Sequence, residues 1–218
     1  MQRMSLPQGT LFDSDTPLAL GSHAFVLPGL ALPYVPELLP ALDAIQRVAP
    51  FRHMVTPGGF EMSVQLTNCG ALGWVTDRHG YRYTAHDPAT GQPWPPMPPS
   101  FLHLAREAAA RAGFDDFTQD ACLINCYEPG SRMSLHQDRN EQDLFAPVVS
   151  VSLGLPAIFQ FGGLTRSGRP ARVPLVHGDV VVWGGPDRLR YHGVLPIEDG
   201  LHPLLGARRI NFTLRRAA

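Results

Sequence analysis

Turn-forming residues divide the second half of this chain into short segments. Glu128-Pro129-Gly130 and Gly184-Gly185-Pro186 are two of these turns, and the 218 residues include 21 Gly and 22 Pro. A helical bundle would not tolerate so many helix breakers. Regularly spaced short strands with such turns predict a sandwich, barrel or jelly roll. The candidate strands are residues 121–127, 147–153, 157–161, 171–176, 179–183, 189–194 and 207–215.

The first half of the chain carries the helical signals. Apolar residues recur at helical spacing over residues 33–48, and a second helix begins near Ser100, a candidate N-cap, and ends at Gly113. Between them lie an aromatic and Gly-rich segment, residues 51–83, and a Pro-rich linker. We therefore expect an α+β, mainly β protein, and a length that suits one domain over residues 1–218.

Charge and hydropathy limit the class of protein. The net charge of -1, with 17% charged and 44% hydrophobic residues, excludes an intrinsically disordered chain. The near-zero total conceals an asymmetry, because residues 151–218 contain nine Arg and four acidic residues, whereas residues 101–150 contain four Arg and eight acidic residues. Global neutrality therefore does not argue against a nucleic-acid partner.

Targeting and cysteine signals are weak. No apolar run is long enough to cross a membrane, and Asp13 and Asp15 interrupt the region where a signal peptide would be apolar. A cytoplasmic protein is therefore expected. Three cysteines without zinc-finger spacing indicate buried thiols rather than a disulfide framework; they are Cys69, Cys122 and Cys126.

A candidate metal site lies in the segment Met133–Asp138. Its sequence MSLHQD places His136 and Asp138 two residues apart, so that in an extended strand both point to the same face. Two His and one carboxylate form the facial triad of non-haem Fe(II) oxygenases. The pair alone is a weak signal, because a surface His near an Asp is usually only solvated. The downstream candidates for a third ligand are His177, His192 and His202.

The last predicted strand reads RINFTLR and alternates strictly. Arg209, Asn211, Thr213 and Arg215 share one face, opposite Ile210, Phe212 and Leu214. An ordinary amphipathic strand would turn this polar face to water. Inside a jelly roll it would instead line a cavity, where two arginines need counter-charges such as a small dicarboxylate. 2-Oxoglutarate is such an acid, and its keto acid end could also chelate iron.

A second strand, ACLINCY over residues 121–127, offers a similar polar face. Asn125 and Tyr127 alternate onto the same side and could bind the same acid by hydrogen bonds. A buried structural Asn or Tyr is the alternative interpretation.

Several motifs together carry a resemblance to a known family. They are NCYEPGSRMSLHQD (Asn125 to Asp138), SVSLGLPAIFQFGG (Ser150 to Gly163), RINFTLR (Arg209 to Arg215), HGDVVVWGG followed by YHGV, and FRHMVTPGGFEMSV with TNCGALGW. In their order and spacing the chain, beyond about residue 20, resembles the AlkB family of Fe(II)/2-oxoglutarate-dependent nucleic-acid demethylases. The resemblance implies a double-stranded β-helix (jelly roll) catalytic core over residues 121–218. It also implies a nucleotide-recognition lid over residues 51–83.

The resemblance also assigns the ligands. It implies His192 as the third metal ligand beside His136 and Asp138, with His177 in a turn and His202 in a loop. It implies that Arg209 binds the distal carboxylate of 2-oxoglutarate and that Arg215 lies near the metal end. The remaining cosubstrate contacts implied are Asn125, Tyr127 and Asn211.

Substrate contacts are implied in the same way. Trp74 would stack on a flipped damaged base, with His136 on the other side, and Tyr81 and Arg166 would contact the substrate near the pocket. The chain departs from the bacterial pattern at three positions. Asn140 replaces an acidic residue near the base edge, and the other two, which replace a tyrosine and a methionine, are Phe60 and Leu66.

The expected function is that of an oxidative demethylase for bases of the 1-methyladenine and 3-methylcytosine type. It would use Fe(II), 2-oxoglutarate and O2, hydroxylate the N-alkyl group, and release formaldehyde, succinate and CO2. The expected substrate is alkylated single-stranded DNA, with RNA and, by base flipping, double-stranded DNA as further candidates, and the protein is expected to be a monomer. One alternative is the same chemistry on RNA, protein or a small molecule. Another is a non-catalytic module that binds modified nucleic acid.

Overall fold

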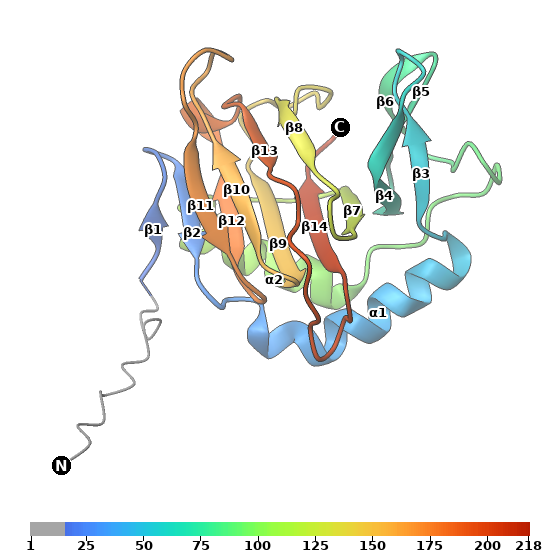
Figure 1. Cartoon of the computed structure of the whole chain (residues 1–218), viewed down its shortest axis with the longest axis horizontal. Helices are drawn as coiled ribbons and strands as arrows, with labels where there is room; N and C mark the ends of the chain where they lie inside the picture. The colour runs from blue at the N-terminus through green and yellow to red at the C-terminus, as the bar shows by residue number, and fades with distance from the viewer. Residues whose placement is uncertain (1–15) are drawn as a thin grey trace.

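The structure, a computed structural model, describes residues 16–218. The first 15 residues of the predicted domain, with Asp13 and Asp15, lie outside the described residues. Figure 1 shows two α-helices on one side of a set of strands. The helices are α1 (Val35–Val48), preceded by the 3-10 turn η1 (Leu32–Tyr34), and α2 (Pro99–Arg111). Neither helix is long and apolar enough to cross a membrane.

Antiparallel strands form a large sheet, a small sheet and a separate hairpin. The eight strands of the large sheet are, in spatial order, β1 (Leu18–Ala19), β2 (Ala24–Leu27), β12 (Val180–Trp183), β9 (Val148–Gly154), β14 (Arg209–Arg215), β7 (Ala121–Tyr127), β4 (Glu61–Gly70) and β3 (Arg52–Val55). The small sheet contains β11 (Ala171–Leu175), β10 (Ala157–Phe161), β13 (His192–Val194) and β8 (Met133–His136). The hairpin contains β5 (Gly73–Asp77) and β6 (Gly80–Thr84).

The helices cover one face of the large sheet. The apolar side of α1 (Leu38, Leu42 and Ile45) is buried together with that of α2, as their spacing predicts. The apolar face of β14, with Ile210, Phe212 and Leu214, enters the same core, and Phe212 stacks on Phe101 of α2 with ring centroids 4.4 Å apart. The apolar side of β14 therefore faces the helices, and its polar side faces the other way.

The two sheets face each other across a second core. Phe159 and Phe161 of β10 pack with Trp183 of β12, and Val194 of β13 belongs to the same cluster. Two facing antiparallel sheets form the expected jelly-roll type of architecture. The polar side of β14 thus lies inside the protein, and every residue of β14 is buried. The interpretation of β14 as a strand with its polar face in water is therefore wrong.

Most predicted elements agree with the structure to within one or two residues. The predicted strand 189–194 is an exception, because only His192–Val194 is extended after the 3-10 turn η2 (Gly185–Asp187). Ser100 is not a cap, since helix α2 begins at Pro99, after the N-cap Pro98. Proline at the first helical position lacks an N–H, so one of the groups that a cap would satisfy is missing. Gly113 does follow the helix end, with a φ of 86°.

Candidate metal and cosubstrate site

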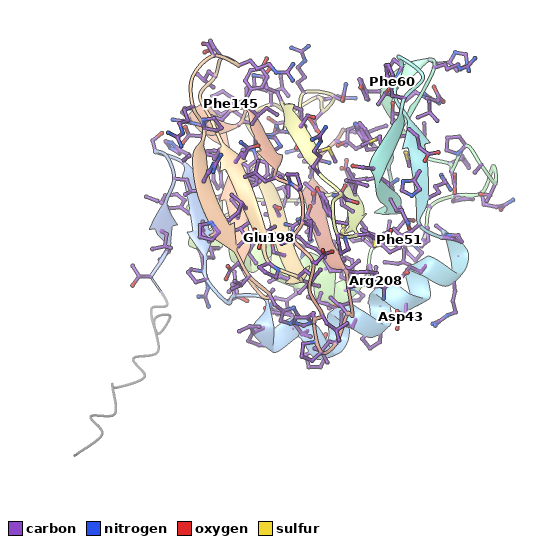
Figure 2. All side chains as sticks on the ribbon, viewed as in Figure 1. Asp43, Phe51, Phe60, Phe145, Glu198 and Arg208 are labelled. Carbon is purple, nitrogen blue, oxygen red and sulfur yellow. The ribbon has the colours of Figure 1, made fainter. Side chains whose placement is uncertain are left out.

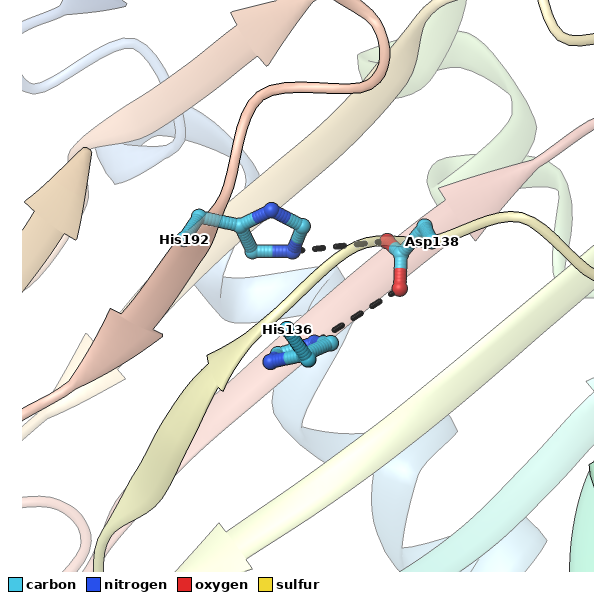
Figure 3. Close-up of side chains that lie close together, drawn as sticks. All are labelled: His136, Asp138 and His192. Atoms are coloured by element: carbon cyan, nitrogen blue, oxygen red, sulfur yellow. Dashed lines mark ion pairs between the residues drawn. The ribbon is translucent and has the colours of Figure 1, made fainter. Parts of the chain in front are cut away.

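The three predicted metal ligands come together at the open edge of the small sheet. His136 ends β8 and is paired in register with His192, the first residue of β13. Asp138 follows β8 by two residues, and its Oδ1 and Oδ2 lie 3.6 Å from Nε2 of His136 and of His192, respectively (Figure 3). One ligand atom from each residue lies within 4.8 Å of the others. Among the described residues, His177 and His202 do not join this group.

Backbone carbonyls set the tautomer of both histidines. Nδ1 of His136 lies 2.8 Å from the carbonyl oxygen of Ser134, and Nδ1 of His192 lies 3.0 Å from that of Arg190. A carbonyl oxygen only accepts, so each Nδ1 carries the proton. In the neutral ring Nε2 then has a free lone pair, and the two Nε2 atoms are the ones that face Asp138.

The surroundings keep the histidine neutral and the aspartate charged. Although 39% of the His136 side chain remains exposed, the surrounding protein and the neighbouring His192 lower the pKa of His136 to about 4. Burial alone would raise the pKa of Asp138, but Arg215 and the two histidines outweigh it and hold that pKa well below its ordinary value. Two imidazoles and one carboxylate form the donor set of non-haem Fe(II) oxygenases.

Arg215 is the partner of the metal-ligand carboxylate. Its Nε and Nη2 donate to Oδ2 of Asp138 at 3.0 and 2.7 Å, and both side chains are almost wholly buried. Charge-assisted bonds of this kind are stronger than neutral ones and fix the carboxylate in place. The expected position of Arg215 near the metal end agrees with this geometry.

Arg209, at the other end of β14, has no such partner. It is 1% exposed, and its Nε and Nη1 have no hydrogen-bond partner among the described residues. Only Nη2 is used, in a 3.0 Å bond to Oγ of Ser152, and the guanidinium lies 5.0 Å from the ring centre of Tyr127. Burial lowers the pKa of Arg209. A buried cation with two free donors fits an acidic ligand, so the residues present suit the carboxylate of 2-oxoglutarate.

The other polar residues of this interior differ in how many of their hydrogen-bonding groups are already used. Asn125 donates to Oδ1 of Asn211 at 3.1 Å, and its own Oδ1 is buried without a partner. Asn211 is fully occupied, because it also donates to Oγ of Ser150 and to the carbonyl of Val151 and accepts from Thr213. Asn211 therefore orients Asn125. Tyr127 is buried beside Arg209.

The expected substrate residues come from the β5–β6 hairpin, from the segment after Asp138 and from the β10–β11 loop. Trp74 of β5 stacks on Tyr81 of β6, with ring centroids 5.6 Å apart, and its Nε1 donates to Oδ1 of Asn140 at 3.3 Å. Arg166 is exposed in the loop between β10 and β11. The two further departures behave differently: Phe60, 76% exposed, lies at the end of the β3–β4 hairpin (Figure 2), whereas Leu66 is wholly buried.

Three polar residues close to the metal ligands were not predicted from the sequence. Glu141 and Arg188 form a buried ion pair at 3.0 Å, and Tyr83 donates to the same glutamate at 2.6 Å. In the sequence, Glu141 sits in the polar run HQDRNEQD and Arg188 follows a Pro-Asp turn, so both look like solvated surface residues. The available signal was the position of Glu141, three residues after a proposed metal ligand.

Comparisons with known proteins agree with this site. The model of the 2OG-Fe(II) oxygenase superfamily matches residues 25–215. The chain is 56% identical over 202 residues to the alpha-ketoglutarate-dependent dioxygenase AlkB of Salmonella typhimurium, which covers 93% of each chain. It is 55% identical over 201 residues to the protein of the same name from Escherichia coli, which covers 92% of each chain. α-Ketoglutarate is another name for 2-oxoglutarate.

A solved structure supports the fold independently. The structure of OsALKBH1 superimposes with a TM-score of 0.80 over 92% of this chain and 100% of that chain, at 24% identity. The fold and the site together define the class of the protein, a non-haem oxygenase that uses a 2-oxo acid. The chain belongs, within that superfamily, to the AlkB family of Fe(II)- and 2-oxoglutarate-dependent dioxygenases.

Proposed function

We propose that this dioxygenase repairs alkylated nucleobases in DNA by oxidative demethylation, with bases of the 1-methyladenine and 3-methylcytosine type as substrates. The observation that carries the proposal is the occurrence, in one interior, of the His136–Asp138–His192 group and of a buried Arg209 that has no acidic partner among the described residues. Two relatives that match this chain over more than nine-tenths of its length are α-ketoglutarate-dependent dioxygenases named AlkB, which supports the same chemistry here.

In this proposal one set of residues binds the metal and a second set binds the cosubstrate. His136, Asp138 and His192 hold Fe(II) through two Nε2 atoms and one carboxylate oxygen. Arg209 takes the distal carboxylate of 2-oxoglutarate, with Tyr127 beside it and Oδ1 of Asn125 left free to accept a hydrogen bond. When bound, Fe(II) with 2-oxoglutarate and O2 would supply the oxidative chemistry that hydroxylates the N-alkyl group, with release of succinate, CO2 and formaldehyde.

A nucleotide-recognition lid over residues 51–83 and a catalytic core over residues 121–218 complete the proposal. The β5–β6 hairpin is not paired with a strand of either sheet, packs against the large sheet through Val75, and carries the stacked Trp74 and Tyr81. Tyr81 is 48% exposed, so aromatic surface is available to a base. An aromatic ring holds any base by stacking, and a cationic methylated base gains further attraction from the ring face.

Positive charge on the loop between β10 and β11 suits a nucleic-acid backbone. The loop between β10 and β11, with the start of β11, carries exposed Arg166, Arg169 and Arg172, and these residues form no ion pair within residues 16–218. Free arginines on one loop fit phosphates. The base must leave its stack to reach the metal site, so the expected substrate is single-stranded or flipped.

The decisive experiment uses the whole chain loaded with Fe(II) and 2-oxoglutarate without air. A single-stranded DNA oligonucleotide carrying one 1-methyladenine is added, air is admitted, and the oligonucleotide is weighed by mass spectrometry. We expect loss of the methyl group with formaldehyde release. His136→Ala and Asp138→Ala should each lower the rate at least about a hundredfold, because the metal supplies several kcal/mol of stabilisation.

Two outcomes would contradict the proposal. Succinate release that is equal with methylated and unmethylated DNA would indicate an oxygenase for another substrate. Tight binding of methylated DNA that survives both substitutions, without any demethylation by the wild type, would indicate a binding module.

Asn140 allows a finer test of base recognition. Trp74 Nε1 can only donate, so Oδ1 of Asn140 faces it and the amide NH2 remains available near the metal site. Asn140→Asp would replace this donor by a carboxylate that accepts from the exocyclic amino group of 1-methyladenine. We expect kcat/KM for that base to rise about threefold to tenfold relative to a methylated base that bears a carbonyl at this edge. Equal ratios in both proteins would show that Asn140 does not contact the base.

A further inference from the structure

Four charged side chains, one of them that of the metal ligand Asp138, form a buried group. Asp138, Glu141, Arg188 and Arg215 are each at most 10% exposed at the side chain, and the two negative charges balance the two positive charges. Glu141 does not belong to the group of side chains that could hold the metal. Burying ions in this way is costly unless each is paired, so the group needs a reason to exist.

Glu141 is the member on which most contacts converge. Its Oε1 accepts from the Tyr83 hydroxyl at 2.6 Å and lies 3.5 Å from Nε of Arg215, and its Oε2 lies 3.0 Å from Nη2 of Arg188. Arg215 also donates to the Tyr83 oxygen at 3.4 Å. One carboxylate therefore holds three groups that come from β6, β14 and the segment after η2.

Both arginines that touch Glu141 also hold Asp138. Arg215 binds its carboxylate, and Nη1 of Arg188 donates to its backbone carbonyl oxygen at 2.6 Å. The side chain and the backbone of this metal ligand are thus fixed by partners that Glu141 positions. Outer partners of this kind orient metal ligands and tune metal affinity.

The same loop segment supports the β5–β6 hairpin at two points. Tyr83 and Trp74 are opposite each other in the hairpin register, so their side chains share one face. From that face Tyr83 reaches Glu141 and Trp74 reaches Asn140, at 2.6 and 3.3 Å. Burial raises the pKa of Tyr83, so its hydroxyl keeps the proton that it donates.

We propose that Glu141 is a positioning residue that joins the β5–β6 hairpin to the metal ligand Asp138, through Tyr83 on one side and through Arg215 and Arg188 on the other. A change in the position of the hairpin would then change the orientation of Asp138 at the metal site. This inference deepens the proposed function, since it gives the hairpin that would cover the substrate a direct connection to the reacting centre.

The test uses Tyr83→Phe and Glu141→Gln in the whole chain. The fold provides a matched control pair, because Tyr34 donates to Glu107 between η1 and α2, far along the chain from the metal ligands. Tyr34→Phe and Glu107→Gln remove the same chemical groups there. The readouts are hydrogen exchange of the amides of residues 73–84 and the dissociation constant of Co(II) alone, measured by titration.

The two variants should distinguish the contact of Glu141 with the hairpin from its contacts with the arginines that hold Asp138. Tyr83→Phe should speed exchange in the hairpin about threefold to tenfold and leave Co(II) binding within about twofold of the wild type. Glu141→Gln should speed hairpin exchange and also weaken Co(II) binding about tenfold to a hundredfold. Neither control should change either quantity.

Two results would overturn the inference. One is hairpin exchange in Tyr83→Phe that equals that of Tyr34→Phe, and the other is Co(II) binding by Glu141→Gln as tight as by Glu107→Gln. Should Glu141→Gln fail to fold, Glu141→Asp is used instead, because it keeps the negative charge. This variant should bind Co(II) as the wild type does, while exchange in the hairpin should be faster than in the wild type. Neither readout uses nucleic acid, so failure of the proposed repair activity would be seen separately from failure of this connection.

Discussion

The two ends of strand β14 hold the same side chain in opposite states. Arg215 donates two hydrogen bonds to Asp138 and lies next to Glu141, so its charge is neutralised within the protein. Arg209 is just as buried, yet its Nε and Nη1 have no partner in the described residues. One strand thus ends in a completed ion pair at one side and an open cationic position at the other.

This difference distinguishes an arginine that maintains the structure from an arginine that can bind a ligand. A buried arginine with its carboxylate keeps a metal ligand oriented, whereas a buried arginine without one is unfavourable until a ligand arrives. The pattern of β14 places both residues on one face and cannot tell them apart. Their roles follow from what the rest of the chain brings to each end.

Substitution of Arg215 should have the largest effect. Arg215→Met leaves the Asp138 carboxylate buried without its guanidinium, and we expect the free energy of unfolding to fall by about 3–5 kcal/mol. Urea denaturation of the metal-free protein measures this. A divalent metal should restore part of the loss, because it supplies positive charge to Asp138. Arg82→Met, which breaks the half-exposed pair with Asp77, should change the same quantity by less than about 1 kcal/mol. Similar losses in both variants would contradict the comparison.

Substitution of Arg209 should affect binding rather than folding. Arg209→Met removes an unpaired buried cation, so the ligand-free protein should be as stable as the wild type or more stable. The KM for 2-oxoglutarate should rise about tenfold to a hundredfold, since charge-assisted bonds are lost. Initial rates and the thermal shift caused by 2-oxoglutarate test both expectations. The exposed neighbour Arg208 provides the control Arg208→Met. A large loss of stability in Arg209→Met would show that its charge is already neutralised.

The smallest effect concerns pH at the Arg209 end. Nδ1 of His177 accepts from the N–H of Gly154, which is the register partner of Arg209. Burial and the neighbouring His202 lower the pKa of His177 in the folded protein. Between that lowered pKa and about 6.5, the unfolded chain binds more protons, so stability should fall as the pH is lowered through this window.

The variant His177→Asn keeps an acceptor for Gly154 but does not titrate. Its melting temperature should therefore change less than that of the wild type between pH 7 and pH 5. Parallel curves for the two proteins would show that His177 does not contribute to the pH dependence.

Local pattern was sufficient for much of this molecule. The alternation of β14 predicted both of its faces, and the i, i+2 spacing together with the family resemblance predicted the metal ligands. Strand β7 was predicted to the residue, because its alternation is uninterrupted and a turn follows it. In these segments the deciding contacts lie within the strand or are implied by its period.

Contacts between distant segments were beyond local pattern. Glu141 and Arg188 are 47 residues apart, and Tyr83 lies 58 residues before Glu141. Each one alone is an ordinary polar residue in a loop or hairpin, and only the folded chain makes them a buried group. Strand β2 was missed for a related reason, since four apolar residues form a strand only because β12 offers them an edge.

The carbonyl bonds of the two metal-binding histidines have a consequence for sequence change. In each case the acceptor is the backbone of the residue two positions earlier, Ser134 or Arg190, and not a side chain. Almost any residue can supply a carbonyl oxygen. The hydrogen bond that orients each ring at the metal site therefore does not depend on which side chain stands at these two neighbouring positions.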